Sequence, residues 1–229
     1  MRLGILGALD AEVALLVRHM EVEEKAEALG TIFYSGRLEG CPVVVAVMSI
    51  GKINAALCTA YMVREMGATA IINVGIAGAM GEGLGVMDVV VSDVVLFHDT
   101  EPQMVKYYPF RARFEADTGL RDKALEACGE VLEGTGHHYR AGLVATGDQF
   151  IASAGQRDSI SARFSPECVE MEGAAVGQAA FVHDVPFLVI RTMSDSADDE
   201  AKDTYDNFMQ DAADQSANIV MKIAKNLAV

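Results

Sequence analysis

Short apolar segments that alternate with helical patterns constrain the fold of this chain more than any other feature. Residues 42–48, 69–74 and 186–192 are runs of mostly Val, Ile, Ala and Leu. Such runs are typical of strands that are covered on both faces of a sheet. Helical patterns occupy 52–66 and 118–132. The alternation predicts an α/β fold, a three-layer sandwich in which helices flank a mixed and mostly covered central sheet.

The remaining segments extend the same pattern along the chain. Further strands are predicted at 2–7, 31–38, 86–97, 140–145 and 167–169, and further helices at 10–20, 172–181 and 204–227. Gly67 follows the helix at 52–66 and is expected to end it. Since no repeat or Pro- or Ser-rich linker divides the sequence, residues 1–229 are expected to form a single domain.

Charge and cysteine usage restrict the class of ligand and the compartment. The net charge of −15 argues against nucleic-acid polymers and anionic membrane surfaces, and is compatible with a small neutral or cationic ligand. The four cysteines form no CxxC pair and the five histidines show no metal-binding pattern. We therefore expect free thiols in a reducing, cytoplasmic compartment, without a metal or a cofactor. No signal peptide or membrane-spanning run is recognised.

Ligands of α/β proteins bind at the carboxyl ends of strands, which directs attention to the segments that follow the predicted strands. These segments are 7–12 (GALDAE), 75–78 (GIAG), 146–151 (TGDQFI), 170–172 (EME) and 194–195 (SD). The segment 75–78 lacks a dinucleotide or P-loop signature and is interpreted as a tight turn. Its backbone N–H groups are candidates for contact with a flat ligand or a nucleophile.

Carboxylates at these strand ends are the candidate catalytic groups. Glu12 begins a helix, where an acidic residue often does no more than favour the helix dipole, but it is also placed to accept a proton from water. Glu170 and Glu172 lie among small and apolar residues, and sugar hydroxyls are suitable partners for such carboxylates. Asp195 follows an apolar strand, and burial there would raise its pKa and let it act as a general acid.

Cleavage of a purine from ribose requires three such groups. Its transition state resembles an oxocarbenium ion, so the leaving base must be protonated, the sugar held and water activated. One acid, one ribose-binding group and one base are therefore needed. The spacing in the sequence does not show that Glu12, Glu172 and Asp195 converge.

Residues 169–175 (VEMEGAA) and 191–195 (RTMSD) resemble the nucleoside phosphorylase/nucleosidase superfamily. With 4–12 and 145–151 added, the chain is similar to the 5′-methylthioadenosine/S-adenosylhomocysteine nucleosidases over nearly its whole length. The resemblance implies hydrolysis of the N-glycosidic bond of these nucleosides, and of 5′-deoxyadenosine, to release adenine. It also implies a homodimer whose partner subunit completes the pocket for the 5′ substituent.

The resemblance also implies a role for each site residue. Glu12 would deprotonate water, Glu172 would bind the ribose hydroxyls, and Asp195, positioned by Ser194, would protonate the purine. The other implied substrate-binding residues are Phe150 and the backbone of Ile151 at adenine, Met171 under the ribose, Ala77 and Gly78 near base and water, Ile50 and Tyr205 at the 5′ substituent, and Glu170 and Arg191 from the same motifs.

The chain departs from the family pattern at two places. After His98-Asp99 the family continues with another aspartate and a Phe-Gly-Tyr segment, whereas this chain has TEPQMVKYYPF at 100–110. Ile76 occupies a position where a small polar residue is common. The first departure leaves the preference for the 5′ substituent and the details of the dimer open, and neither touches the catalytic carboxylates.

Three other functions compete with this interpretation. A phosphorylase would need cations near the first strand, where Asp10 and Glu12 would repel phosphate. A nucleosidase acting on futalosine or on another 5′-modified nucleoside would differ in base or 5′ preference, which the sequence does not resolve. A nucleoside sensor would have no need for both Glu12 and Asp195.

Overall fold

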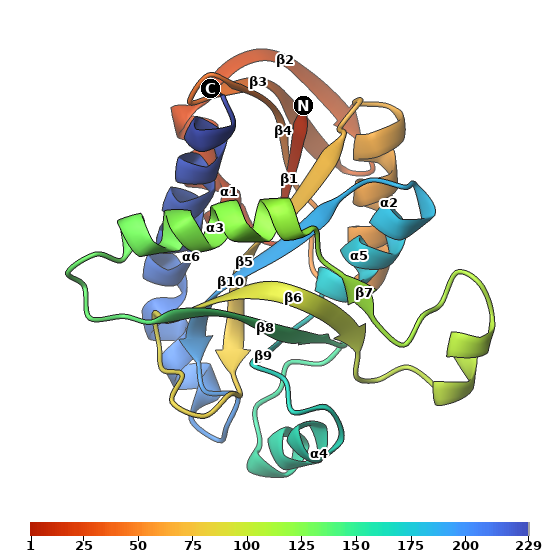
Figure 1. Ribbon diagram of the computed structural model, residues 1–229, viewed down its shortest axis with the longest axis vertical. Coiled ribbons are helices and arrows are strands. Elements are labelled where there is room, and N and C mark those ends of the chain that lie inside the picture. The colour runs from red at the N-terminus through yellow and green to blue at the C-terminus, as the bar shows by residue number, and fades with distance from the viewer. Residues whose placement is uncertain (229) are drawn as a thin grey trace.

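Ten strands join one mixed sheet in residues 1–228, the part of the chain described by the computed structural model (Figure 1). The strands are β1 (Leu3–Gly7), β2 (Glu21–Ala28), β3 (Thr31–Leu38), β4 (Cys41–Val47), β5 (Ala70–Ala79), β6 (Val89–Phe97), β7 (Phe114–Glu115), β8 (Tyr139–Thr146), β9 (Cys168–Glu170) and β10 (Phe187–Asp195). The order is β10-β6-β8-β9-β5-β1-β4-β3-β2, with β7 beside β6. The α/β prediction with a mixed central sheet is confirmed.

Six α-helices and one 3₁₀ helix connect the strands of this region. They are α1 (Asp10–His19), α2 (Lys52–Arg64), η1 (Pro102–Lys106), α3 (Thr118–Val131), α4 (Ala154–Phe164), α5 (Gly173–Val182) and α6 (Ala201–Leu227). Gly67 adopts a positive φ of 69° shortly after α2, as expected for a residue that ends a helix. Among the described residues, no helix is long and apolar enough to span a membrane.

The strand β5 organises the sheet because it pairs with three neighbours. It runs parallel to β1 and to β10, and its last residues pair antiparallel with β9. In addition, β10 pairs with β6, β6 with β8, and β8 with β9, so these four strands and β5 close into a ring. The strands β1, β4, β3 and β2 extend the ring as an open sheet. The carboxyl ends of β1, β5 and β10 thus lie side by side.

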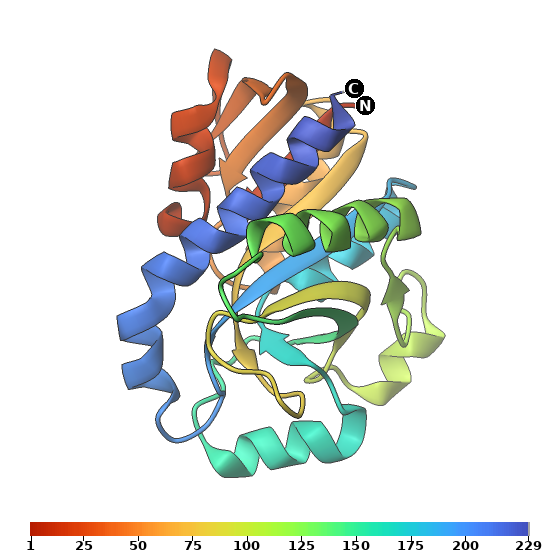
Figure 2. The same cartoon turned by 60° about the vertical axis from the view of Figure 1, so that its left-hand side comes forward.

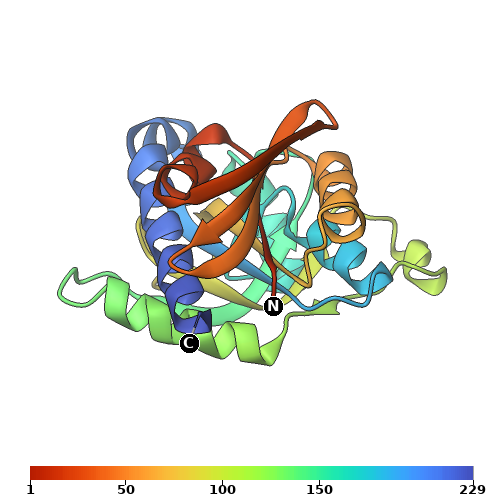
Figure 3. The same ribbon diagram turned by 90° about the horizontal axis from the view of Figure 1, so that it is seen from above.

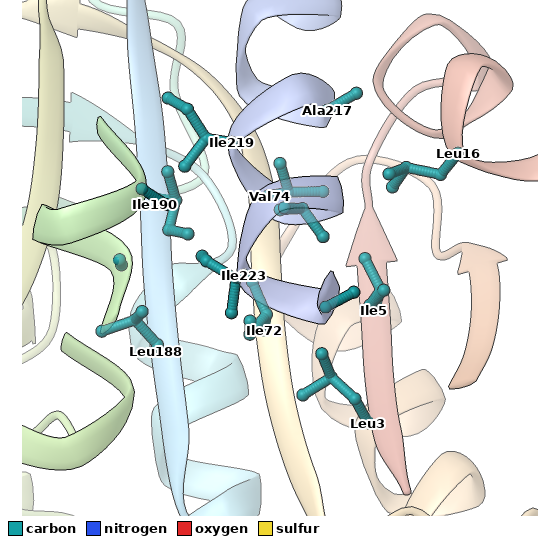
Figure 4. Close-up of a cluster of buried hydrophobic side chains, with 14 of the residues drawn as sticks. Leu3, Ile5, Leu16, Ile72, Val74, Leu188, Ile190, Ala217, Ile219 and Ile223 are labelled. Carbon is teal, nitrogen blue, oxygen red and sulfur yellow. The ribbon is translucent and has the colours of Figure 1, made fainter. Parts of the chain in front are cut away.

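Helices cover both faces of the sheet and bury its apolar side chains. One cluster joins β1, β5 and β10 to α1, α3 and α6, as Figure 4 shows for Ile5, Ile72 and Ile190 against Ile219 and Ile223. A second cluster packs the opposite face against α2 and α5. Figure 3 shows α6 and α2 on opposite sides of the sheet. Successive side chains of a strand point to opposite faces and so belong to different clusters. Both faces are covered, which explains why these strands have continuous apolar sequences.

The prediction of a turn at 75–78 is wrong, because these residues belong to β5. Gly75 and Gly78 serve close packing instead of a change in chain direction. A Cβ atom on Gly75 would collide with the carboxyl group of Glu12, and one on Gly78 would lie 2.9 Å from Oδ1 of Asp195. Glycine therefore lets two acidic side chains pack directly on the strand.

The short η1 and β7 and two longer elements escaped the sequence analysis, and the two longer ones did so because they bury few apolar side chains. The strand β2 has the sequence EVEEKAEA, and each of its residues is exposed or half-buried. The helix α4 buries Ile160 alone among its residues, and the side chain of Ser153 caps its start by accepting a hydrogen bond from Gln156 N–H. Figure 2 shows α4 at the same end of the molecule as the N-terminus of α6. All four cysteines are buried and free, as predicted.

Candidate active site

A cavity of ≈ 410 Å³ opens at the carboxyl ends of β1, β5 and β10. Eleven of the predicted site residues line it, namely Glu12, Ile50, Ala77, Gly78, Phe150, Glu170, Met171, Glu172, Ser194, Asp195 and Tyr205. Ile151 lines a small adjoining cavity together with Phe150 and Asp195. Arg191 lines neither of these two cavities. The structure therefore brings together segments from most of the length of the chain.

A larger cleft of ≈ 1030 Å³ lies between α1, β3 and α2. Most of the residues that line it are apolar. Asp10 is the one charged residue among the described residues of this lining, and its side chain is exposed. A buried acid or base with a perturbed pKa is the usual sign of a catalytic site. The smaller cavity, which has four buried acidic residues, is therefore the candidate active site.

Arg191 lies buried behind the cavity and holds its polar groups together. Its Nη2 donates to Glu170 and, over 2.6 Å, to Oδ1 of Asn73, and it lies 3.8 Å from Oε2 of Glu172. Burial alone would lower the pKa of the guanidinium, but the negative charges of Glu170, Glu172 and Glu12 outweigh this effect and raise it. Arg191 therefore stays charged at 1% exposure.

Glu170 uses its acceptor capacity within the protein. One oxygen accepts from the Thr146 hydroxyl, and the other from Arg191 and from the N–H groups of Glu172 and Gly173, at 3.1 and 2.7 Å. Thr146 in turn accepts from Ala174 N–H over 2.8 Å. Glu170 therefore fixes the start of α5 and forms an ion pair with Arg191 at the edge of the cavity.

Glu12 is held at the end of β1 by three backbone N–H groups. Its Oε2 accepts from Ala8 and Leu9 over 2.6 and 2.9 Å, and its Oε1 accepts from Ile76 over 3.1 Å. Burial raises the pKa of Glu12, although Arg191 and the backbone donors act in the opposite direction. An oriented carboxylate whose proton affinity is increased is suited to accept a proton.

Glu172 lies at the N-terminus of α5 with one firm donor. Its Oε1 accepts from Gly51 N–H over 2.8 Å. Burial, followed by the charge of the neighbouring Glu170, raises the pKa of Glu172 to about 8. Unlike Glu170, this carboxyl group keeps acceptor capacity for a ligand that carries hydroxyl groups.

Asp195 is the last residue of β10 and is also buried. Its Oδ2 accepts from the Ser194 hydroxyl over 2.9 Å, and its Oδ1 accepts from Ala197 N–H over 2.8 Å. Burial raises the pKa of Asp195 more than these two hydrogen bonds lower it. The side chain is therefore oriented by two donors and favours the protonated form that a general acid requires.

Apolar side chains form the open side of the cavity. Phe150 is 45% exposed, and its ring meets that of Tyr205 edge-on, with the centroids 5.7 Å apart. Ile50, at the end of the loop that precedes α2, is 49% exposed. An exposed aromatic face at the mouth of a cavity is suited to stack on a flat base.

Several residues of the site were missed by the sequence analysis. Asn73 and Thr146 position Arg191 and Glu170, and Lys202 and Asp206 line the cavity from the first turns of α6. Asn73 carried a signal, because it is a polar residue within an otherwise apolar strand. Lys202 and Asp206 resemble any charged residue on an exposed helix, and their place at the cavity depends on tertiary packing.

Taken together, the cavity holds the buried carboxyl groups of Asp195, Glu12 and Glu172, and the ring of Phe150 forms part of its wall. Within residues 1–228, no group of three or more His, Cys, Asp or Glu side chains is arranged to hold a metal ion. This set of groups matches the three tasks in the cleavage of a glycosidic bond to a purine.

Comparisons with known proteins agree with this chemistry. The sequence profile of the phosphorylase superfamily matches residues 2–225. The 5′-methylthioadenosine/S-adenosylhomocysteine nucleosidase of Oceanobacillus iheyensis is 34% identical over 233 residues, which cover 99% of this chain and 100% of the relative.

Solved structures are similar over the same extent. The nucleosidase of the same name from Neisseria meningitidis, in complex with methylthio-immucillin-A, has a TM-score of 0.92 and 35% identity, covering 98% of this chain and 99% of its own. The futalosine hydrolase of Helicobacter pylori has a TM-score of 0.90 at 27% identity, covering 99% and 98%. The chain therefore belongs to the phosphorylase superfamily and, within it, to the family of the 5′-methylthioadenosine/S-adenosylhomocysteine nucleosidases.

Proposed function

We propose that the protein hydrolyses the N-glycosidic bond of 5′-methylthioadenosine and S-adenosylhomocysteine, and also of 5′-deoxyadenosine, to release adenine. The observation that carries the proposal is the presence in one cavity of Asp195, Glu172 and Glu12, each buried and each with a raised pKa. The family to which the chain belongs supports the choice of substrate.

Asp195 is the general acid of this proposal. Protonation of the purine nitrogen on the imidazole side turns the base into a neutral leaving group, which lowers the barrier to breaking the bond to the anomeric carbon. Ser194 donates to the carboxyl oxygen Oδ2 and so fixes the orientation of the group. Phe150 stacks on the adenine ring, and the backbone of Ile151 contacts its Watson–Crick edge.

Glu12 is the base that activates water. Its carboxylate is oriented by three N–H donors and lines the same cavity as Ala77 and Gly78 of β5. Glu172 accepts hydrogen bonds from the ribose hydroxyls, with Met171 beneath the sugar. We assign Glu170 and Arg191 a supporting role, because their hydrogen bonds go to protein groups.

The charge of the cavity favours water over phosphate as the nucleophile. Glu12, Glu170, Glu172, Asp195 and Asp206 line it, whereas Lys202, at its exposed side, is the one cationic residue among its described lining. A phosphate group would face several carboxylates without a cationic partner at the base of the cavity. Phosphorolysis is therefore disfavoured.

We further propose that the protein forms a homodimer that completes the pocket for the 5′ substituent. Large apolar side chains are exposed on α2 and beside η1, with Ile53 at 75%, Tyr107 at 70% and Tyr108 at 76% exposure. Ile50, three residues before Ile53, is 49% exposed and also lines the cavity, so a partner subunit on this surface would reach the cavity. Exposed apolar surface of this extent is typical of protein–protein interfaces.

Asp195→Asn tests the assignment of the general acid. The amide keeps the shape of the side chain, and its oxygen can still accept from Ala197 N–H, but it has no carboxyl proton to transfer, so kcat/KM for 5′-methylthioadenosine falls by at least ~10²-fold. Adenine release is followed by chromatography, and Asp203→Asn, an exposed acid of α6, serves as the control. An Asp195→Asn enzyme with wild-type turnover contradicts the assignment.

Glu172→Gln is expected to lower activity and to change the pH dependence of stability. The pKa of this carboxyl group rises from its ordinary 4.5 to about 8 on folding, so its contribution to stability is lost as the pH rises through this interval. Glutamine cannot ionise, and the variant therefore gains stability relative to wild type between about pH 5 and pH 8. Urea unfolding at both pH values measures the gain. A difference in unfolding free energy between variant and wild type that is the same at both pH values contradicts the burial of an ionisable group at this site.

Ile53→Asp tests the dimer. Light scattering is expected to give twice the mass of the chain for wild type and the mass of one chain for the variant, because a desolvated charge opposes association. Leu29→Asp, at a position 52% exposed on the β2–β3 turn, is the matched control and is expected to remain dimeric. A monomeric wild type with full activity contradicts the proposal.

A further inference from the structure

A cluster of three charged side chains lies beside the cavity without lining it. The ammonium group of Lys52 donates to Oδ1 and Oδ2 of Asp99 over 2.8 and 2.7 Å and lies 3.2 Å from Oδ2 of Asp148. Two hydrogen bonds from backbone N–H groups complete the cluster. Lys52 N–H donates to Oδ1 of Asp148 over 3.0 Å, and Asp148 N–H donates to Oδ2 of Asp99 over 2.9 Å. The proposed chemistry uses none of these residues.

The cluster joins two segments that carry groups of the active site. Lys52 is the first residue of α2 and directly follows Gly51, whose N–H is the donor to Glu172. Asp148 precedes Phe150 by two residues in the loop after β8. The position of the ribose-binding carboxyl group is thus connected to the aromatic wall through Lys52 and its two partners.

Gly51 has little freedom to move independently of this cluster. Its φ of 100° is a conformation that other residues rarely adopt, and a Cβ atom there would lie 3.4 Å from Oδ1 of Asp148. The loop after β8 therefore packs closely against the peptide whose N–H orients Glu172. A shift of Asp148 would move this peptide and the Phe150 loop together.

The ion pairs are partly shielded, and their loss would have a measurable effect. The side chains of Lys52 and Asp99 are 22% and 26% exposed. Burial raises the pKa of Asp99, but the hydrogen bonds and charge of Lys52, together with Asp148 N–H, lower it below its ordinary value. Without Lys52, two carboxylates that share one cation would repel each other.

We propose that Lys52 is a positioning residue for the hydrolysis: by holding Asp99 and Asp148 against the start of α2, it fixes Gly51 N–H on Glu172 and Phe150 over the cavity. The inference rests on the proposed function and adds a residue that does not contact the substrate. Misplacement of binding groups by about 1 Å can reduce a rate by ~10²-fold, so a residue in this position affects turnover without touching the reacting atoms.

The test compares Lys52→Met with wild type by two measurements. The dissociation constant of adenine reports on the base site alone, and kcat and KM for 5′-methylthioadenosine report on the whole reaction. We expect the adenine dissociation constant and KM to rise by at least ~10-fold, because both the Phe150 loop and Glu172 lose their anchor. Lys52→Arg, which can still pair with two carboxylates, is expected to restore both constants to within ~3-fold of wild type.

The pH profile of kcat/KM distinguishes a positioning residue from a merely structural one, whose loss would leave the profile unchanged. The Gly51 hydrogen bond lowers the pKa of Glu172, so weakening of this bond raises the pKa. Because the ionised carboxylate accepts the ribose hydroxyls, the rising limb of kcat/KM moves to higher pH in Lys52→Met. Lys222→Met is the matched control, since it removes a partly exposed ion pair, with Glu130, that lies on no part of the cavity.

An adenine dissociation constant, a KM and a kcat that all stay within ~2-fold of wild type in Lys52→Met would overturn the inference, even if the variant melts at a lower temperature. If that variant does not fold, Asp99→Asn, which leaves Asp148 as the one carboxylate of the cluster, decides by the same constants. If wild type itself releases no adenine, the proposed function fails, and adenine binding by the variants still decides the role of Lys52.

Discussion

The burial of Arg191 behind three glutamates is the interaction on which the rest of the site depends. An unpaired guanidinium at 1% exposure would cost several kcal/mol, and its partners Glu170 and Asn73 offset part of this cost. Arg191 belongs to β10, and its partners Asn73 and Glu170 belong to β5 and β9, so the pairing of β5 with both of the other strands brings the three residues together. Close packing around this arginine explains why residue 75 is a glycine, since a Cβ atom there would collide with Glu12 and lie 3.2 Å from Nη1 of Arg191.

One cation shared by three carboxyl groups gives them different roles. Glu170 forms the direct ion pair and accepts from three further donors, and it becomes part of the framework. Glu12 and Glu172 receive only part of the attraction, so burial dominates and raises the pKa of each. Burial raises the pKa of Asp195 in the same way, and Ser194, the preceding residue of β10, orients its carboxyl group. The same residue type can therefore serve as support, base or acid according to its surroundings.

The sequence predicted those parts of the fold in which burial requires a recognisable pattern of apolar residues. The strands β4, β5 and β10 are covered on both faces, and their continuous apolar sequences located them to within a few residues, whereas the exposed β2 left no such pattern. The glycines at 75 and 78 were misinterpreted because close approach of a side chain and a turn call for the same residue. The three catalytic candidates could be predicted from strand ends. The contacts of Lys52 could not, because they link residues 47 and 96 positions apart.

The central claim is that water attacks the anomeric carbon, and isotope transfer tests it most directly. Purified protein is incubated with 5′-methylthioadenosine in phosphate-free buffer made with ¹⁸O-labelled water. The products are separated, and their masses are determined by mass spectrometry. The account predicts free adenine and methylthioribose that carries one ¹⁸O at its anomeric position, at a rate that added phosphate does not change. Release that requires phosphate, with a ribose 1-phosphate product free of the label, would contradict it.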